Sequence, residues 1–96
     1  MGAEYARSGE PTLVLAGRDP ESAPAVELFA YRIARSIECG ERPNGHWRVV
    51  RAALHAADCM RTYTAAVSRC GAIERSSNYY LALDLLKKHA PTGDAA

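Results

Sequence analysis

The residues with the clearest potential for binding chemistry cluster on and just before a predicted central helix. Spacings of three and four residues place three of them on one side of that helix. Arginine forms planar, bidentate contacts with phosphates and carboxylates, and tryptophan adds apolar contact area. We therefore predict a surface for a phosphate group or an acidic protein patch, with a solvated helix face as the alternative. The predicted set is Arg42, Trp47, Arg48, Arg51, His55 and Arg69.

The charge distribution supports this interpretation. Residues 42–75 carry six arginines against two acids, Asp58 and Glu74, which is a net charge of +4 in a chain whose overall net charge is +1. Residues 1–41 carry four arginines against seven acids. The region of the central helix is therefore the positive part of the molecule.

Metal and catalytic chemistry have weaker support in the sequence. His55 and Cys59 are four residues apart, a spacing that can supply two metal ligands, but a structural zinc site needs four. We expect Cys59 to be a small buried residue and His55 a surface residue. The chain has no glycine-rich phosphate loop, no catalytic pair of carboxylates and no third member for a Cys–His site. We predict no enzyme activity, no metal site and no cofactor.

The central helix is predicted over residues 46–70, between Gly45 and Gly71, and it is apolar on two adjacent sides. An antiparallel neighbour can cover only one of these stripes, and the many alanines favour close helix packing. The first stripe is Val50, Ala53, Leu54, Ala57, Met60, Thr64 and Val67. The second stripe is Val49, Ala52, Ala56, Cys59, Tyr63, Ala66 and Cys70.

Two further helices are predicted on either side. The first covers residues 23–39, with Ser22 as its N-cap and Glu27 directed away from its apolar stripe of Val26, Phe29, Ala30, Ile33, Ala34 and Ile37. The short loop GERPNG makes it an antiparallel hairpin with the central helix. The third helix covers residues 77–89 and ends before Pro91. We expect the third helix, or a second subunit, to cover the second stripe.

A strand is predicted over residues 11–17, where the apolar residues Thr12, Leu13, Val14 and Leu15 lie between Pro11 and Gly17. A single strand leaves its backbone groups without partners, so it must pair with another segment. Pairing about a two-fold axis in a homodimer is one solution, and an extended segment lying along the helices is another. Together with the second stripe, the strand leads us to predict a homodimer.

Composition limits the class of protein. Ninety-six residues form a single domain, for which we expect residues 1–10 and 90–96 to be flexible. No run approaches a membrane span and the N-terminus lacks a secretory pattern, so we expect no membrane partner. Three cysteines without a CxxC spacing favour a reduced, cytoplasmic protein. The predicted fold class is mainly α, a three-helix domain on a helical hairpin with one short N-terminal β-strand.

Four segments carry a resemblance to a known group of proteins. TLVLAGRDPESAPAV, the following helix, ECGERPNG and the alanine-rich ALHAADCM resemble small phage- and prophage-encoded proteins of unassigned function. The resemblance covers about residues 12–61. It implies a phage accessory protein in the host cytoplasm and supplies no catalytic residues.

By analogy with anti-CRISPR and other counter-defence factors, we expect a non-enzymatic inhibitor that binds a nucleic-acid-handling host complex by protein–protein contact. One alternative is a small protein that binds nucleic acid or a nucleotide directly through the arginine face. A phage structural or assembly component is another.

Overall fold

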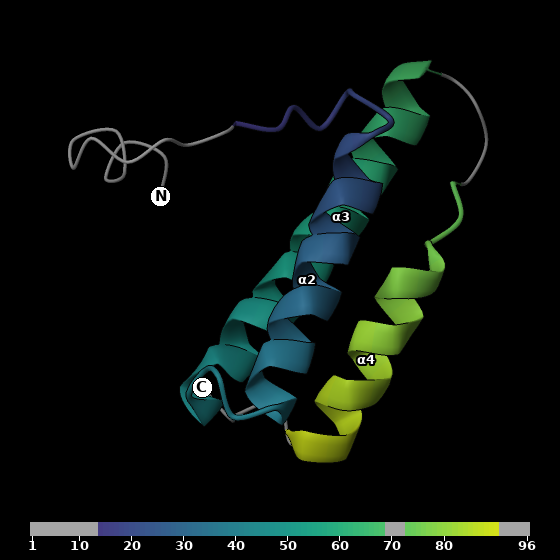
Figure 1. Ribbon diagram of the computed structural model, residues 1–96. Helices are drawn as coiled ribbons and strands as arrows, with labels where there is room; N and C mark the ends of the chain where they lie inside the picture. The colour runs from purple at the N-terminus through teal and green to yellow at the C-terminus, as the bar shows by residue number, and fades with distance from the viewer. Residues whose placement is uncertain (1–13, 69–72, 91–96) are drawn as a thin grey trace.

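The computed structural model describes residues 14–68 and 73–90 and is mainly helical. In chain order the elements are α2 (Ser22–Glu38), a short 3₁₀ turn η1 (Asn44–His46), α3 (Trp47–Ser68) and α4 (Ser77–His89), as Figure 1 shows. The prediction of three helices on an antiparallel hairpin is confirmed, with helix bounds within two residues of those predicted. No helix in the described ranges combines the length and apolarity that crossing a membrane requires.

The predicted strand is not seen in the part of it that the structure describes. Residues 14–16 have no regular secondary structure, and Val14 is 83% exposed. Thr12 and Leu13 lie outside the described residues. The described end of this segment instead follows the helices: Leu15 lies against them, and the Thr64 hydroxyl donates a hydrogen bond to the Gly17 carbonyl.

Side-chain hydrogen bonds fix the start of α2, although not in the predicted way. Glu21 is the N-cap, and its backbone N–H donates to the Asp19 carboxylate at 2.9 Å. Ser22, predicted as the cap, is the first helical residue, and its hydroxyl donates to the Ala16 carbonyl at 2.7 Å. These bonds fold residues 16–21 back over the end of the helix. At the other end, Gly40 has a φ of 83°, a conformation that favours glycine and stops α2.

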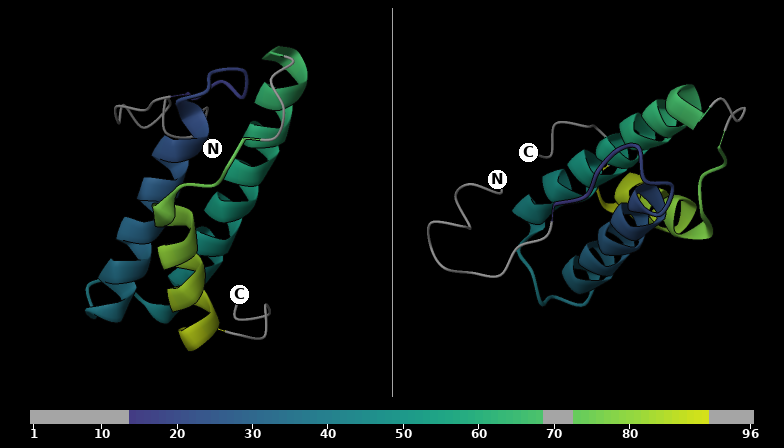
Figure 2. Two further views of the ribbon diagram at one scale, coloured as in Figure 1. Left: turned by 90° about the vertical axis from the view of Figure 1, so that its right-hand side faces the viewer. Right: turned by 90° about the horizontal axis from the view of Figure 1, so that it is seen from above.

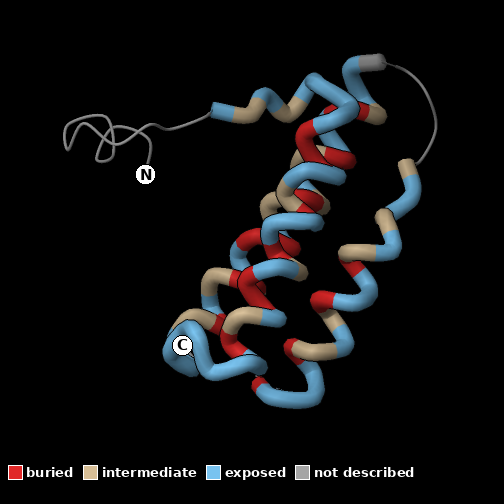
Figure 3. Tube along the Cα trace, in the orientation of Figure 1, coloured by how far each residue is buried: buried red, intermediate tan, exposed pale blue. Residues whose placement is uncertain are grey.

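The core lies where the three helices meet (Figure 3). It combines four residues of α2, four of α3 and three of α4 with the buried Ala90. These are Ala30, Ile33, Ala34, Ile37, Trp47, Val50, Ala53, Leu54, Tyr79, Ala82, Leu86 and Ala90. Burial of Ala90 corrects the expectation that the flexible C-terminal tail begins at residue 90.

The position of α4 differs from our expectation. This helix packs mainly against α2, on one side of the α2–α3 pair, and contacts α3 less extensively (Figures 1 and 2). It therefore leaves the second apolar stripe of α3 uncovered. Ala52, Cys59, Tyr63 and Ala66 are exposed, and Val49 and Ala56 are only partly buried. Cys70, the last residue of that stripe, lies outside the described residues.

Candidate functional site

The structure does not gather the predicted arginine set into one surface. Trp47 is 3% exposed and stacks on the ring of His89, with 5.4 Å between the ring centroids, so it packs in the core. The Arg51 guanidinium donates a hydrogen bond to the Ala90 carbonyl at 3.0 Å. These two residues hold α3 to the end of α4, and neither offers its functional group to a partner.

The other members of the set are separated. Arg42 lies in the loop before α3, with 3.4 Å between its Nη1 and the Nδ1 of His46. Arg48 is exposed on a different side, where it lines the groove described below. His55 is exposed beside Cys59, and Arg69 lies outside the described residues. The predicted arginine face is therefore not one continuous surface in the described part of the chain.

The His55–Cys59 pair is positioned as the spacing predicted, with 3.6 Å between Nε2 and Sγ. Cys59 is exposed, which corrects its expected burial. Among the described residues, no three His, Cys, Asp or Glu side chains gather as a metal-binding group.

The most distinctive surface is a groove between α2 and α3, which we call the α2–α3 groove. It has a volume of about 980 Å³, and no residue of α4 lines it. Small side chains of α3 form much of the lining, and Phe29 of α2, half exposed, stands beside them. The lining residues are Leu15, Ala25, Val26, Phe29, Arg48, Val49, Ala52, Ala53, Ala56 and Met60. Arg48 is the single charged residue among them.

A basic side chain borders this groove near the start of α3, where Arg48 is part of its lining. Arg32, three residues after Phe29, lies on a neighbouring part of α2 and is exposed. The groove is therefore an apolar channel with one arginine in its lining.

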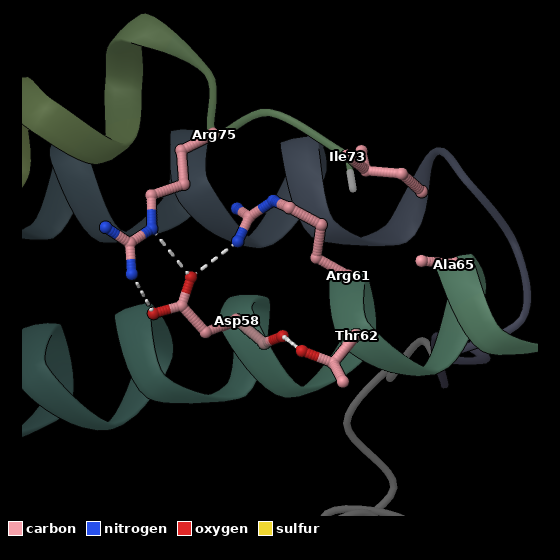
Figure 4. A pocket seen from close by; sticks show the side chains of 6 residues that line it. All are labelled: Asp58, Arg61, Thr62, Ala65, Ile73 and Arg75. Carbon is pink, nitrogen blue, oxygen red and sulfur yellow. Dashed lines mark hydrogen bonds and ion pairs between the residues drawn. The ribbon is translucent and has the colours of Figure 1, made fainter. Parts of the chain in front are cut away.

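A polar cluster holds the three helices together, and we did not predict it from the sequence. Asp58 of α3 accepts hydrogen bonds from Arg61 Nη1 at 2.5 Å and from Arg75 Nε at 3.0 Å, as Figure 4 shows. It also accepts one from the Tyr79 hydroxyl at 3.0 Å. Arg75 also lies over the Tyr79 ring, 4.3 Å from its centroid. These contacts join α3 to the segment before α4 and to α4 itself.

Within the same cluster, Glu27 and Arg61 form a buried ion pair between α2 and α3. Glu27 is 1% exposed and Arg61 is 6% exposed, so the prediction that Glu27 faces outward is wrong. Glu27 also accepts a hydrogen bond from the Ser76 backbone N–H at 3.2 Å. The spacing did contain a signal, because Glu27 precedes Ala30 and Ala34 by three and seven residues on the buried side.

Burial and neighbouring charges shift two pKa values in this cluster. Burial, then the positive charge of Arg75, lowers the pKa of Arg61. Burial, then the hydrogen bond to Asp58, raises the pKa of Tyr79. A pocket of about 540 Å³ lies beside Asp58, Arg61 and Arg75 (Figure 4). Its arginines already pair with Asp58 and Glu27, so we assign the cluster to stability.

The α2–α3 groove is therefore the candidate functional site. Comparison of the chain with protein-family models, with curated proteins and with solved structures produced no match.

Proposed function

We propose that this protein is a non-enzymatic, phage-type homodimer that inhibits a host defence complex by protein–protein contact. The observation that carries the proposal is the α2–α3 groove, an apolar surface that the chain's own α4 leaves uncovered. A continuous apolar surface bordered by charged residues is typical of protein interaction sites. Burying such a surface against another protein removes apolar area from water, which is the main driving force of association.

The composition of the groove favours a helical partner surface. The α3 side of the groove has small side chains, which let another helix approach closely: Ala52, Ala53 and Ala56. On the α2 side, Phe29 supplies a large apolar contact. Helix-in-groove binding uses this combination of a shallow apolar channel and a few large anchors. The groove lacks the converging polar groups that bind and orient a small-molecule substrate.

The structure does not favour the nucleic-acid alternative. That hypothesis needed arginines and an aromatic side chain on one face, whereas Trp47 is in the core and Arg51 is bonded to Ala90. Exposed arginines that are spread over different sides cannot follow one phosphate backbone. Nothing in the described residues favours a structural role in the phage particle over an inhibitory one.

The biological setting of the proposal comes from the resemblance to phage-encoded proteins. A protein of this kind acts in the cytoplasm of the host cell, and we propose a nucleic-acid-handling defence complex as its target. The dimer is the form that we propose binds the target.

Phage plating on defended hosts tests this function. The protein is expressed in bacteria that carry a nucleic-acid-targeting defence system, and in matched bacteria without that system. We expect at least a tenfold rise in plating on one defended host and no change on the undefended host. Phe29→Glu, which places a charge in the groove, should abolish the rise. Leu28→Glu is the matched control, because Leu28 is similarly exposed but does not line the groove.

Two results would contradict the proposal. Unchanged plating across a panel of such defence systems would remove the inhibitory function. Equal protection by the Phe29→Glu and Leu28→Glu variants would show that the groove is not the surface that matters.

A further inference from the structure

We infer that His55 and Cys59 form one half of a zinc site, and that a second copy of this chain supplies the other half across a two-fold axis through the metal. Neither residue lines the α2–α3 groove, so the site is separate from the surface assigned to the host protein. The inference rests on the homodimer of the proposed function and gives that dimer a metal-binding interface.

The two ligand atoms already have the separation that tetrahedral zinc requires. His55 Nε2 and Cys59 Sγ are 3.6 Å apart. Bonds of about 2.0–2.1 Å to nitrogen and about 2.3 Å to sulfur, at the tetrahedral angle, separate two ligand atoms by about 3.5–3.6 Å. The side chains therefore need little rearrangement to bind the metal, and the thiol proton passes to solvent as the sulfur coordinates.

Both side chains are accessible to a metal ion. They are exposed on α3, in an open depression of about 470 Å³. The residues that line this depression are His55, Asp58, Cys59, Thr62, Tyr63 and Ala66. An imidazole nitrogen and a thiolate sulfur together favour Zn²⁺ over Mg²⁺ and Ca²⁺, which take oxygen ligands.

The described part of one chain does not complete this site. Asp58 shares the depression, but its carboxylate is occupied. Its two oxygens accept hydrogen bonds from Arg61, Arg75 and Tyr79. In residues 14–68 and 73–90, no third His, Cys, Asp or Glu joins the pair. Structural zinc sites have four protein ligands, and we predicted no metal site from the sequence because we counted the ligands of a single chain.

A second copy supplies the missing ligands without a new residue type. When a two-fold axis passes through the metal, each copy contributes one histidine and one cysteine, which gives the Cys₂His₂ set of structural zinc sites. The exposed neighbours along this side of α3 have short side chains that let a second helix approach: Ala52, Thr62 and Ala66. The core lies on the opposite side of α3, where Leu54 and Ala57 are buried, so α2 and α4 do not obstruct the contact.

A dilution series of the full chain with and without Zn²⁺ tests the inference. The protein is stripped of metal with a chelator, kept reduced with a phosphine, and studied by sedimentation velocity at about 1–100 μM, a range that spans a micromolar Kd. We expect Zn²⁺ to lower the Kd of the dimer at least tenfold and Mg²⁺ to leave it unchanged. Equilibrium dialysis should find one bound Zn²⁺ for every two chains.

Substitutions assign the effect to the two ligands. Cys59→Ser and His55→Ala should each abolish the response to Zn²⁺ while keeping the helical circular-dichroism spectrum of the wild type. Cys39→Ser is the matched control and should respond like the wild type, because Cys39 is also exposed but lies at the end of α2. Co²⁺ in place of Zn²⁺ should give the visible absorption of tetrahedral thiolate coordination, and Cys59→Ser should lose it.

Three results would overturn the shared site: a dimer Kd that does not respond to Zn²⁺, one Zn²⁺ bound to each monomer, or equal responses of the Cys59→Ser and Cys39→Ser variants. These outcomes are distinct from failure of the proposed function. A dimer that forms equally well without Zn²⁺ would remove the metal site and leave the proposed homodimer in place. A Zn²⁺-linked dimer that protects no phage would retain the site and remove the inhibitory role.

Discussion

Two charged residues, Glu27 and Arg61, are buried in the three-helix interface. Their ion pair compensates for the loss of hydration that burial causes. Taking a charge out of water costs several kcal/mol unless a partner and hydrogen bonds compensate. Here Arg61 faces Glu27 and also donates to Asp58, and Glu27 accepts from the Ser76 backbone. We predicted that Glu27 would point away from the apolar stripe, although it precedes the buried Ala30 and Ala34 by three and seven residues. We assigned no position to Arg61 from the sequence.

Removing one charge of this pair should destabilise the fold strongly. Glu27→Gln keeps an oxygen that can accept the Ser76 N–H but leaves the Arg61 charge buried without its counter-charge. We expect a loss of about 3–5 kcal/mol in the free energy of unfolding, measured by urea denaturation at fixed protein concentration. Glu38→Gln is the control, because Glu38 pairs with His89 and Arg35 near the surface, where such pairs contribute about 0–1 kcal/mol.

Replacing both charges together should cost less than replacing one. In the double variant Glu27→Leu with Arg61→Leu no unpaired charge remains, so its loss of stability should be smaller than that of Glu27→Leu alone. A Glu27→Gln variant within about 1 kcal/mol of the wild type would show that the pair is not a buried constraint.

Tyr79 should make stability fall at alkaline pH. Burial and the hydrogen bond to Asp58 raise its pKa in the folded chain above the ordinary value of 10.0. The folded chain therefore keeps the phenol proton more tightly than the unfolded chain. The stability that the protonated Tyr79 contributes to the folded chain is fully present below the unfolded-state pKa. It is lost as the pH rises through the folded-state pKa.

Tyr79→Phe removes the titrating group and should flatten this dependence, whatever its effect at neutral pH. Tyr80→Phe is the matched control, because the Tyr80 side chain is half exposed. Urea titrations of all three proteins at pH 8 and at about pH 10.5, just above the ordinary tyrosine pKa, measure the difference. Equal losses in the wild-type and Tyr79→Phe proteins would contradict the assignment.

At the scale of elements, local signals in the sequence predicted the helices well. Gly40 stops α2, the GERPNG loop returns the chain, and apolar spacing predicted α4 at its observed bounds. Placement of α4 could not be predicted in this way, because periodicity shows which sides of a helix are apolar and not which neighbour covers them. The second stripe of α3 looked like a contact for α4, but α4 packs mainly on α2.

Arg51 shows how the sequence could predict a residue's position but not its role. The spacing correctly placed it on α3, but the residue it contacts is 39 positions later, at the end of α4. Its guanidinium donates to the Ala90 carbonyl, one of the last acceptors of the helix, where positive charge is also favoured by the helix dipole.

Arg51→Met should therefore destabilise the packing of α4. We expect a loss of about 1–3 kcal/mol in the free energy of unfolding, because the bond involves a charged donor and is partly buried. The single tryptophan, Trp47, stacks on His89 at the same end of α4, so its fluorescence reports this contact during urea denaturation. Arg42→Met, at an exposed loop position, is the control and should change stability by less than about 0.5 kcal/mol. Equal effects of the two substitutions would argue against a role for Arg51 at the end of α4.

At the scale of the whole molecule, the fold explains which surface remains for a partner. The chain buries one side of α3 against α2 and α4 and leaves the α2–α3 groove open, with Arg48 in its lining. The sequence did predict an extra apolar side on the central helix, and from it a homodimer. It could not predict that Leu15, Val26 and Phe29 would join that side, because they come together only through tertiary packing.

The mass of the protein in solution tests the central claim most directly. Light scattering of the full chain over a dilution series up to about 100 μM, where a dimer with a micromolar Kd is almost fully formed, measures that mass without a label. We predict twice the chain mass of 10.4 kDa at the highest concentration, with dissociation on dilution. A mass of 10.4 kDa throughout the series would contradict the proposed homodimer.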